Sequence, residues 1–290
     1  MKLTNNYGIP QTFMNVLARP TYNKGKSHLS ATQLLNSPKI VALTNKFDSE
    51  LEQDASDMVW SIFGSAVHNF LEHGKDENHL VEERMHVEHD GWKISGAVDL
   101  QIINADGIDV RDYKTTSVWA VMNEKIEWEL QLNVYAWLIE KVKGKPITSL
   151  GIVAILRDWK AREKQQKEGY PESPIKEVPI RLWSMAEREE YISKRISAHS
   201  ACEFELETDG KLPDCSPDEM WEKPAVWDVR KTGNVRAKSL HDSEESALQA
   251  LEELGKGYEV EFRAGERTRC ENYCLVNTYC QQYRDYKESK

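Results

Sequence analysis

The sequence lacks any hydrophobic run long enough to cross a lipid bilayer, which takes about 20 apolar residues in a row. The segment Met1–Pro10 is polar and lacks the apolar stretch of a secretory signal peptide. Together these two absences predict a cytoplasmic protein with no membrane-bound segment.

An excess of positive charge is also missing. The chain has 38 Lys and Arg residues against 48 Asp and Glu residues, which gives a formal net charge of −10. A surface this acidic argues against a protein that coats nucleic acid with its whole exterior, because the phosphates would be repelled. It leaves open an enzyme whose groove is locally basic.

Cysteine is scarce, and the 5 cysteines are an odd number with most of them near the C-terminus. This pattern does not fit the disulfide framework of a secreted protein. Clustered thiolates instead bind Zn²⁺ or iron–sulfur clusters, which usually take four ligands. Cys270, Cys274 and Cys280 form the cluster, Cys215 is the candidate fourth ligand, and Cys202 falls inside a predicted helix. The alternative is a set of reduced structural thiols.

The most informative stretch contains two predicted strands, Ser95–Ile103 and Ile108–Tyr113, joined by a tight turn. Asp112 and Lys114 are two residues apart, so their side chains project to the same face of the sheet. Asp99 lies on the preceding strand and can approach Asp112 if the two strands pair. The stretch therefore predicts two carboxylates and an amine on neighbouring strands.

Two carboxylates supply the hard oxygen ligands that Mg²⁺ or Mn²⁺ takes. A cation held there lowers the pKa of a bound water and neutralises charge on a phosphate, while a lysine orients the water or stabilises the transition state. This chemistry suits phosphodiester hydrolysis. Taken alone, the same residues also fit a surface hairpin with one salt bridge.

The flanking periodicity predicts a helix over 55–73 that buries a broad apolar stripe, a strand over 80–89, a helix over 123–143 and a buried strand over 147–156. The predicted order is helix, three strands, helix, strand. A further strand is expected over 175–183, followed by a long helix over 184–207. This pattern favours an α/β protein with a mixed central sheet that is covered by helices on both faces.

In sequence order, these elements carry Gly64 with His68, Gly96-Ala97-Val98-Asp99, Asp112-Tyr113-Lys114 and Gln131 with Tyr135. This series resembles the histidine, G-x-x-D, D-x-K and Q-x-x-x-Y motifs of the RecB-like and phage-type exonuclease branch of the PD-(D/E)XK nuclease superfamily. The resemblance covers roughly Ser27–Leu156. It implies a restriction-endonuclease-like core.

The resemblance also implies roles for individual residues. It implies metal ligation by His68, Asp99, Asp112 and the Tyr113 carbonyl, and catalysis by Lys114 together with Asp99 and Asp112. Nucleic-acid contact or bracing of the site would come from Gln131, Tyr135, Thr115 and Thr116. Glu72 and Glu83 would either support the ligands or be solvated.

The chain divides by its patterns into a nuclease core with N-terminal helices over 1–208 and a small α+β module with the cysteine cluster over 209–290. RecB-like enzymes with an iron–sulfur cluster have a cysteine before the histidine helix, but this chain has Ser37-Pro38 there. The usual four-cysteine arrangement therefore cannot form. Phage-type relatives with a cysteine like Cys215 and a C-terminal trio resemble the chain better.

The resemblance implies an Mg²⁺- or Mn²⁺-dependent DNA exonuclease in phage or bacterial recombination, repair or degradation. It would act in the cytoplasm of the bacterium or infected host, on ends of double- or single-stranded DNA. A single-strand-binding or annealing protein is the expected kind of recombination partner. An inactive DNA-binding or regulatory subunit, and an enzyme acting on RNA or nucleotides, are the alternatives.

The basic segment Arg157–Lys167 follows the predicted core. It could follow a phosphate backbone while Trp159 stacks on a base. A charged, solvated loop is the alternative.

Overall fold

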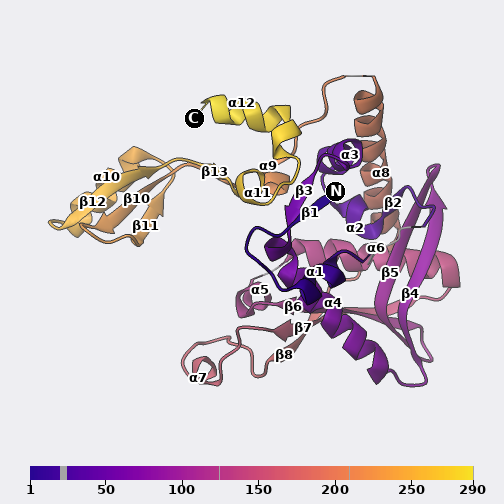
Figure 1. The fold of residues 1–290 in the computed structure, drawn as a ribbon. Helices are drawn as coiled ribbons and strands as arrows, with labels where there is room; N and C mark the ends of the chain where they lie inside the picture. The colour runs from indigo at the N-terminus through magenta and orange to yellow at the C-terminus, as the bar shows by residue number, and fades with distance from the viewer. Residues whose placement is uncertain (20–24, 124, 209, 290) are drawn as a thin grey trace. The chain divides into compact units, whose positions relative to one another are not determined.

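The computed structural model describes residues 1–19, 25–123, 125–208 and 210–289. The chain forms two compact units, Met1–Leu212 and Pro213–Lys290. Figure 1 shows the helices and strands of each unit. None of the helices in these residue ranges is long and apolar enough to cross a membrane.

A six-stranded mixed sheet forms the centre of the first unit, in the order β2-β5-β6-β7-β8, with β4 paired to β5. The β6–β7 and β2–β5 pairs are parallel and the others are antiparallel. The predicted mixed sheet and the predicted order of helix, three strands, helix, strand are confirmed. The strands are β2 Leu29–Ser30, β4 His79–His89, β5 Trp92–Ile103, β6 Ile108–Thr116, β7 Ile147–Leu156 and β8 Ile175–Ile180.

The β4–β5 hairpin turns at Asp90 and Gly91, which both have positive φ angles of 49° and 75°. Two such residues form the type I′ turn that matches the twist of antiparallel strands. The β5–β6 turn depends on Gly107, where a Cβ would come within 2.3 Å of the Pro146 carbonyl oxygen. Asn104 Oδ1 also accepts the Gly107 N–H at 2.8 Å. These local contacts fix the pairing of three consecutive strands.

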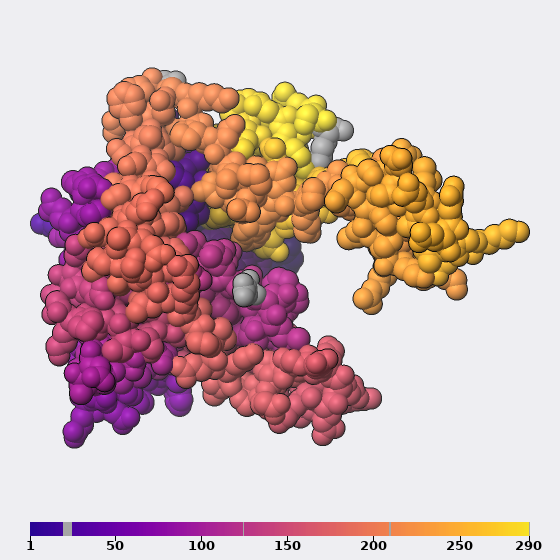
Figure 2. Space-filling view, turned by 180° about the vertical axis from the view of Figure 1, so that it is seen from behind, coloured from indigo at the N-terminus to yellow at the C-terminus, as the bar shows by residue number. Residues whose placement is uncertain are grey.

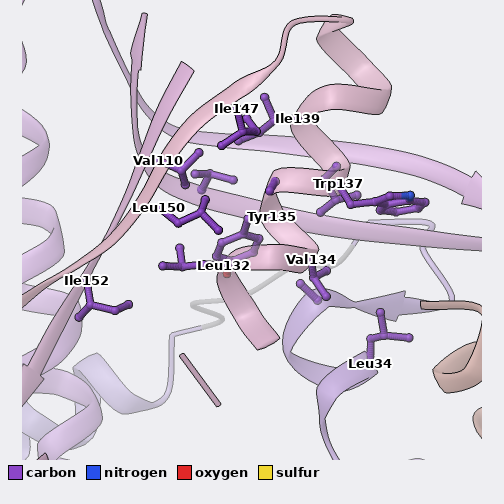
Figure 3. Close-up of a cluster of buried hydrophobic side chains, with 14 of the residues drawn as sticks. Leu34, Val110, Leu132, Val134, Tyr135, Trp137, Ile139, Ile147, Leu150 and Ile152 are labelled. Atoms are coloured by element: carbon purple, nitrogen blue, oxygen red, sulfur yellow. The ribbon is translucent and has the colours of Figure 1, made fainter. Parts of the chain in front are cut away.

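Helix α6 (Ile126–Lys143) supplies the core that covers one face of the sheet, as Figure 3 shows. Trp137, Leu138 and Ile139 are fully buried on it. The helix ends at Gly144, whose left-handed φ of 63° suits a residue without a side chain. Its close approach to β5 requires Gly96, because a Cβ there would lie 2.7 Å from Leu138 Cδ1.

Helix α8 (Met185–Glu207) begins with a capping box in which Ser184 and Glu187 bond each other's backbone N–H groups. It packs against α2 (Ala31–Leu35) and α3 (Pro38–Phe47). His199 on α8 donates to the Leu34 carbonyl oxygen, with 3.2 Å between the atoms. The long C-terminal helix of this unit is therefore tied to the N-terminal helices.

The predicted helix over 55–73 is present as the 3₁₀ turn η1 (Ala55–Met58), the helix α4 (Val59–Leu71) and the 3₁₀ turn η2 (Glu72–Gly74). The prediction that it buries a broad apolar stripe is wrong, because no residue of α4 is buried. Phe63 and Phe70 are 44% and 80% exposed. Helix α4 packs on β6, so periodicity gave the correct element but the wrong environment.

The second unit contains a three-stranded antiparallel sheet in the order β11-β10-β12, covered by α10. Strands and helices are both present, as expected for a small α+β module. A short pair, β9 with β13, and three short helices complete the unit. These elements are β9 Glu222–Lys223, β10 Val226–Lys231, β11 Ala237–His241, α10 Glu244–Leu254, β12 Tyr258–Arg263, β13 Glu266–Arg267, α9 Pro217–Met220, α11 Thr268–Asn272 and α12 Gln281–Ser289.

Candidate functional site

Three carboxylates lie side by side on three adjacent strands of the sheet. The pairing of Val81 with Leu100 and of Glu83 with Val98 places Glu82 on β4 opposite Asp99 on β5. Asp99 Oδ2 accepts the N–H of Tyr113, which is next to Asp112 on β6. The sheet therefore brings Glu82, Asp99 and Asp112 together on one face.

His68 reaches the same face from α4. Its Nδ1 lies 3.5 Å from Glu82 Oε1 and 3.5 Å from Asp99 Oδ2. Its Nε2 donates to the Tyr113 carbonyl oxygen at 3.0 Å. One ligand atom from each of His68, Glu82 and Asp99 lies within 4.8 Å of the other two. This bond to the carbonyl orients the imidazole so that Nδ1 faces the carboxylates.

Burial and like charge act together on this cluster. Asp99 is 8% exposed, and burial followed by the nearby Asp112 charge raises the pKa of Asp99 to about 7. The hydrogen bond with Glu82 and the charge of Asp99 raise the pKa of His68. These shifts show concentrated negative charge, which a divalent cation would neutralise.

Lys114 and Asp112 form an ion pair, with 2.6 Å between Nζ and Oδ2. The Asp112 side chain is almost fully buried, whereas that of Lys114 is 27% exposed. Alternation along β6 places both on the face that carries Asp99. The ammonium group therefore lies beside the carboxylate cluster and is accessible to solvent.

Gln131 and Tyr135 approach this pair from α6. The Gln131 amide donates to the Tyr135 hydroxyl oxygen at 2.9 Å and to Asp112 Oδ1 at 3.4 Å. Tyr135 is buried within the hydrophobic core. These contacts connect Asp112 to the core through an amide and a phenol.

Thr115 and Thr116 end β6 and are half-buried. Thr115 Oγ1 faces Gly64 of α4, where a Cβ would be 3.5 Å away. The Thr116 carbonyl oxygen accepts the N–H of Arg157 at 3.0 Å. Both threonines therefore lie at the junction of β6 with α4 and with the end of β7.

Sequence reasoning missed Glu82 and considered Glu83 and Glu72 instead. Glu83 projects to the other face of β4, where it binds Lys143 Nζ at 2.7 Å and Gln101 Nε2 at 2.7 Å. Glu72 follows α4 in η2. A signal for Glu82 was available, because a two-residue turn at Asp90-Gly91 fixes the register that sets Glu82 opposite Asp99.

The basic segment after β7 contains internal ion pairs that balance much of its charge. Glu163 binds Lys160 and Lys167, and Lys164 binds Glu172. Trp159 packs against the core and donates its indole N–H to the Pro171 carbonyl oxygen at 2.8 Å. The expectation that Trp159 stacks on a base is therefore wrong. Helix α7 (Ala161–Lys164) lies on this segment, which protrudes from the first unit (Figure 2).

The four candidate cysteine ligands all belong to the second unit, whereas Cys202 is buried in α8 of the first. Burial first, and then the charges of Cys274, Cys215 and Cys280, raise the pKa of Cys270 to about 11. Cys215 and Cys280 are each 9% exposed. The structure thus brings the four thiols into one neighbourhood, although no three of their sulfur atoms lie within 4.8 Å of one another.

Side-chain amides hold the two ends of this cysteine group. Gln282 Oε1 accepts the Cys215 N–H at 2.8 Å, and Gln282 Nε2 donates to the Cys215 carbonyl oxygen at 3.0 Å. Asn277 Nδ2 donates to the Cys270 carbonyl oxygen at 2.9 Å. These bonds fix the backbone that carries the thiols.

The sequence model of the PD-(D/E)XK nuclease superfamily matches residues 36–281. Because this match includes most of the chain, the protein belongs to the PD-(D/E)XK nuclease superfamily. The predicted superfamily and α/β fold class are confirmed, and the family supports a nuclease. Its members use divalent metals, and His68, Glu82 and Asp99 form a group that could hold such an ion.

Two solved structures are similar to parts of the chain. SSO0001 has 19% sequence identity and a TM-score of 0.44, covering 64% of this chain and 82% of its own. A protein from Eubacterium rectale, provisionally described as an exonuclease, has 10% identity and a TM-score of 0.30, covering 68% of this chain and 73% of its own. No curated protein matches the chain.

Proposed function

We propose that the protein is a metal-dependent DNA exonuclease that hydrolyses phosphodiester bonds at the Asp99–Asp112 site. The observation that carries this proposal is the convergence of His68, Glu82 and Asp99 within 4.8 Å, beside the ion pair of Asp112 with Lys114. Superfamily membership supports nuclease chemistry. The motif order that resembles the RecB-like branch favours DNA and an exonuclease.

The donor set fits Mg²⁺ or Mn²⁺. Carboxylate oxygens of Asp99, Asp112 and Glu82 are hard ligands, and His68 Nδ1 faces two of them. The Tyr113 carbonyl oxygen is adjacent to His68 Nε2 and stays a predicted ligand. A cation bound by this set would supply a Lewis acid that makes a water nucleophilic near neutral pH.

The protein's own groups have separate tasks in this proposal. Lys114 places a positive charge beside Asp112, where it binds a non-bridging phosphate oxygen and orients the attacking water. Gln131 holds Asp112 in position and Tyr135 holds Gln131. Thr115 and Thr116, at the end of the same strand, bind the backbone of the substrate strand.

A test incubates the purified full chain with end-labelled linear DNA and with closed circular DNA, in Mg²⁺, Mn²⁺ or EDTA. We expect metal-dependent release of nucleotides from linear DNA, and a loss of several orders of magnitude in rate for Asp112→Ala and Lys114→Ala. Cleavage of circular DNA would favour an endonuclease. Wild-type activity in both variants would reject the site.

An inactive DNA-binding or regulatory subunit is the second candidate. The net charge of −10 motivates its regulatory form, because an acidic protein gains little from general attraction to DNA. Salt-dependent DNA binding that is indifferent to EDTA, without strand loss, would support it. Labelled RNA of the same sequence tests the remaining alternative, an enzyme that acts on RNA.

We also propose a metal site at Cys215, Cys270, Cys274 and Cys280. Tetrahedral Zn²⁺ with bonds of about 2.3 Å needs sulfur atoms roughly 3.8 Å apart. No three of the four sulfur atoms lie within 4.8 Å of one another, and the resemblance to RecB-like enzymes that carry an iron–sulfur cluster favours such a cluster over Zn²⁺. Such a group would cross-link the loop before α9 to α11 and to the segment between α11 and α12.

A role in phage or bacterial DNA recombination, repair or degradation follows from the same family resemblance, as does location in the cytoplasm. A single-strand-binding or annealing protein remains the expected partner. Co-purification of the full chain with such a protein, with and without DNA, tests this expectation.

A further inference from the structure

One ridge of α4 connects the carboxylate site to an exposed tryptophan. Trp60, Gly64 and His68 are four residues apart and so lie along one side of the helix, which runs beside β6. His68 meets this strand at the carboxylates, and Gly64 meets it at Thr115. Trp60 is two turns from His68, about 12 Å along the helix axis.

Trp60 carries a cation on its ring. The Arg157 guanidinium carbon lies 4.4 Å from the ring centroid, and Phe63 meets the indole edge-on with 6.4 Å between centroids. The Trp60 residue is nevertheless 61% exposed. An exposed indole backed by a guanidinium offers a flat apolar surface beside a positive charge.

A second pair of the same kind follows β6 directly. Trp119 on α5 (Val118–Met122) is 63% exposed, and Lys125 Nζ lies 5.1 Å from its ring centroid. Helix α5 begins four residues after Lys114. Helices α4 and α5 can both be followed beside β6 in Figure 1.

Hydrogen bonds join the two pairs at the end of the sheet. Arg157 N–H donates to the Thr116 carbonyl oxygen at 3.0 Å, and Asp158 Oδ1 accepts the Val118 N–H at 2.7 Å. The segment after β7 is thereby bonded both to the end of β6 and to the start of α5. Trp60 and Trp119 are therefore both anchored at the C-terminal end of the strand that carries Asp112 and Lys114.

We propose that Trp60 and Trp119 stack on unpaired bases of a single DNA strand whose backbone enters the carboxylate site. Bases in a duplex have both faces covered, so exposed indoles select unpaired bases. Arg157 and Lys125, which lie on these rings, bind the phosphates that connect the bases. The inference rests on the proposed nuclease function and specifies its substrate as single-stranded DNA or a frayed duplex end.

Two observations favour a nucleic-acid strand over a protein partner on this surface. Each tryptophan ring is paired with a cation, and cations beside aromatic rings suit a polyanion. The surface is also continuous with the carboxylate site through the α4 ridge. A strand that follows this ridge would span about three to four nucleotides at 3.4 Å per base step.

The test measures binding of the full chain to a labelled 20-nucleotide oligo(dT) in EDTA, so that no cleavage occurs. Trp60→Ala and Trp119→Ala should each weaken binding roughly 5- to 150-fold, the effect of losing one stacked base. Trp60→Phe should keep most of the affinity because a phenyl ring still stacks. Phe204→Ala is the matched control, since Phe204 is 63% exposed on α8.

An oligonucleotide that has a normal backbone but abasic sugars separates stacking from phosphate binding. Wild type should bind it more weakly than oligo(dT), whereas the double variant Trp60→Ala/Trp119→Ala should bind both about equally. Unchanged affinity of the double variant for oligo(dT), or tighter wild-type binding to duplex or to oligo(rU), would overturn the proposal.

Failure of this inference and failure of the nuclease function give different results. Tryptophan-dependent binding without cleavage in Mg²⁺ or Mn²⁺ would reject the nuclease function and keep the binding surface. Metal-dependent digestion, together with wild-type affinity of the tryptophan variants for oligo(dT), would keep the nuclease function and reject the binding surface.

Discussion

Glu82 lies directly opposite Asp99 across β4 and β5. The ladder between these strands runs from the pair His79–Ile102 to the pair His89–Trp92 and is interrupted at Glu82 and Asp99. Glu82 has a φ of 49°, in the left-handed region that costs a non-glycine residue about 1–2 kcal/mol. With this backbone conformation, the Glu82 carboxylate lies close to the side chains of His68 and Asp99. Strain of this kind is often retained where it positions a ligand.

We predict opposite effects of Glu82→Gly on stability and on metal affinity. Glycine removes the φ penalty, so the metal-free protein should gain roughly 1 kcal/mol in free energy of unfolding. Loss of a carboxylate ligand should weaken Mn²⁺ binding about 10- to 100-fold. Urea denaturation in EDTA and calorimetric titration with Mn²⁺ measure the two quantities.

The isosteric Glu82→Gln variant provides the control, because it keeps the strained backbone and loses only the charge. It should lose Mn²⁺ affinity without the gain in stability. Wild-type Mn²⁺ affinity in both variants would remove Glu82 from the metal site.

Gln131→Leu should lower kcat about 10- to 100-fold with a small change in KM for DNA. Gln131 is the amide that holds Asp112 Oδ1, and its loss leaves the carboxylate free to rotate away from the productive geometry. Single-turnover digestion of linear DNA measures the chemical step. Tyr135→Phe, which removes only the hydroxyl that Gln131 binds, should have a smaller effect in the same direction. Equal rates for wild type and Gln131→Leu would show that the contact is not needed.

Gly96→Ala should destabilise the protein by roughly 1–3 kcal/mol, the usual effect of overpacking a core. The added methyl group would lie 2.7 Å from Leu138 Cδ1 and 3.0 Å from Tyr135 Cε1. Gly74→Ala is the control, since its Cβ would meet nothing within 4 Å. Thermal or urea unfolding compares the two, and equal stabilities would mean that α6 can shift away from β5.

The contribution of His199 to folding stability should fall as the pH drops from 6.5 toward 4, while the raised pKa of Asp99 acts in the opposite direction. Burial lowers the pKa of His199 to about 4, the bond to Leu34 opposes this shift, and the charge of Arg195 adds to it. Between pH 6.5 and 4, His199 is therefore protonated in the unfolded chain but neutral in the folded protein. The stability that His199 contributes above pH 6.5 is lost as the pH falls toward 4. The expected loss is roughly 3 kcal/mol, at about 1.4 kcal/mol per pH unit.

The control for His199 is His199→Gln, whose amide can still donate to the Leu34 carbonyl oxygen but does not titrate in this range. Urea unfolding at several pH values should show that the stability of wild type relative to this variant falls by roughly 3 kcal/mol between pH 6.5 and 4. A dependence as steep as that of wild type would assign the acid sensitivity to other groups.

The cysteine site predicts bound metal after anaerobic purification. We expect iron with acid-labile sulfide, a brown absorbance, and loss of both in Cys280→Ser and Cys215→Ser. Cys202→Ser should keep them, because Cys202 lies in the first unit. Stoichiometric zinc would identify the alternative metal, and a protein free of both would leave four reduced thiols.

The sequence was sufficient to predict five of the six strands of the sheet, all except the two-residue β2, because each of the five has a local signal. The Asp90-Gly91 turn and the apolar run Ile147–Leu156 are such signals, and β4, β5, β6, α6 and β7 all lie within a few residues of their expected positions. The environment of α4 could not be predicted in the same way. Apolar periodicity predicts which face of a helix is apolar, but not whether another part of the protein covers that face. The aromatic side chains of α4 are exposed to solvent.

Glu82 shows a different limit of sequence reasoning. The register of the Asp90-Gly91 hairpin sets it opposite Asp99, but residue type does not predict its positive φ angle. Trp159 shows the reverse, since its sequence context suggested an exposed ring whereas Pro171 and the core cover it. Both errors depend on contacts between segments that are distant in the sequence.

Helix α6 fills the interior with Trp137 and also holds the Asp112 carboxylate through Gln131. A substitution that loosened the packing of α6 would therefore also shift the Asp112 carboxylate, even if the protein still folded. Selection for catalytic activity would therefore also preserve the packing of the core, so activity and core packing are expected to change together.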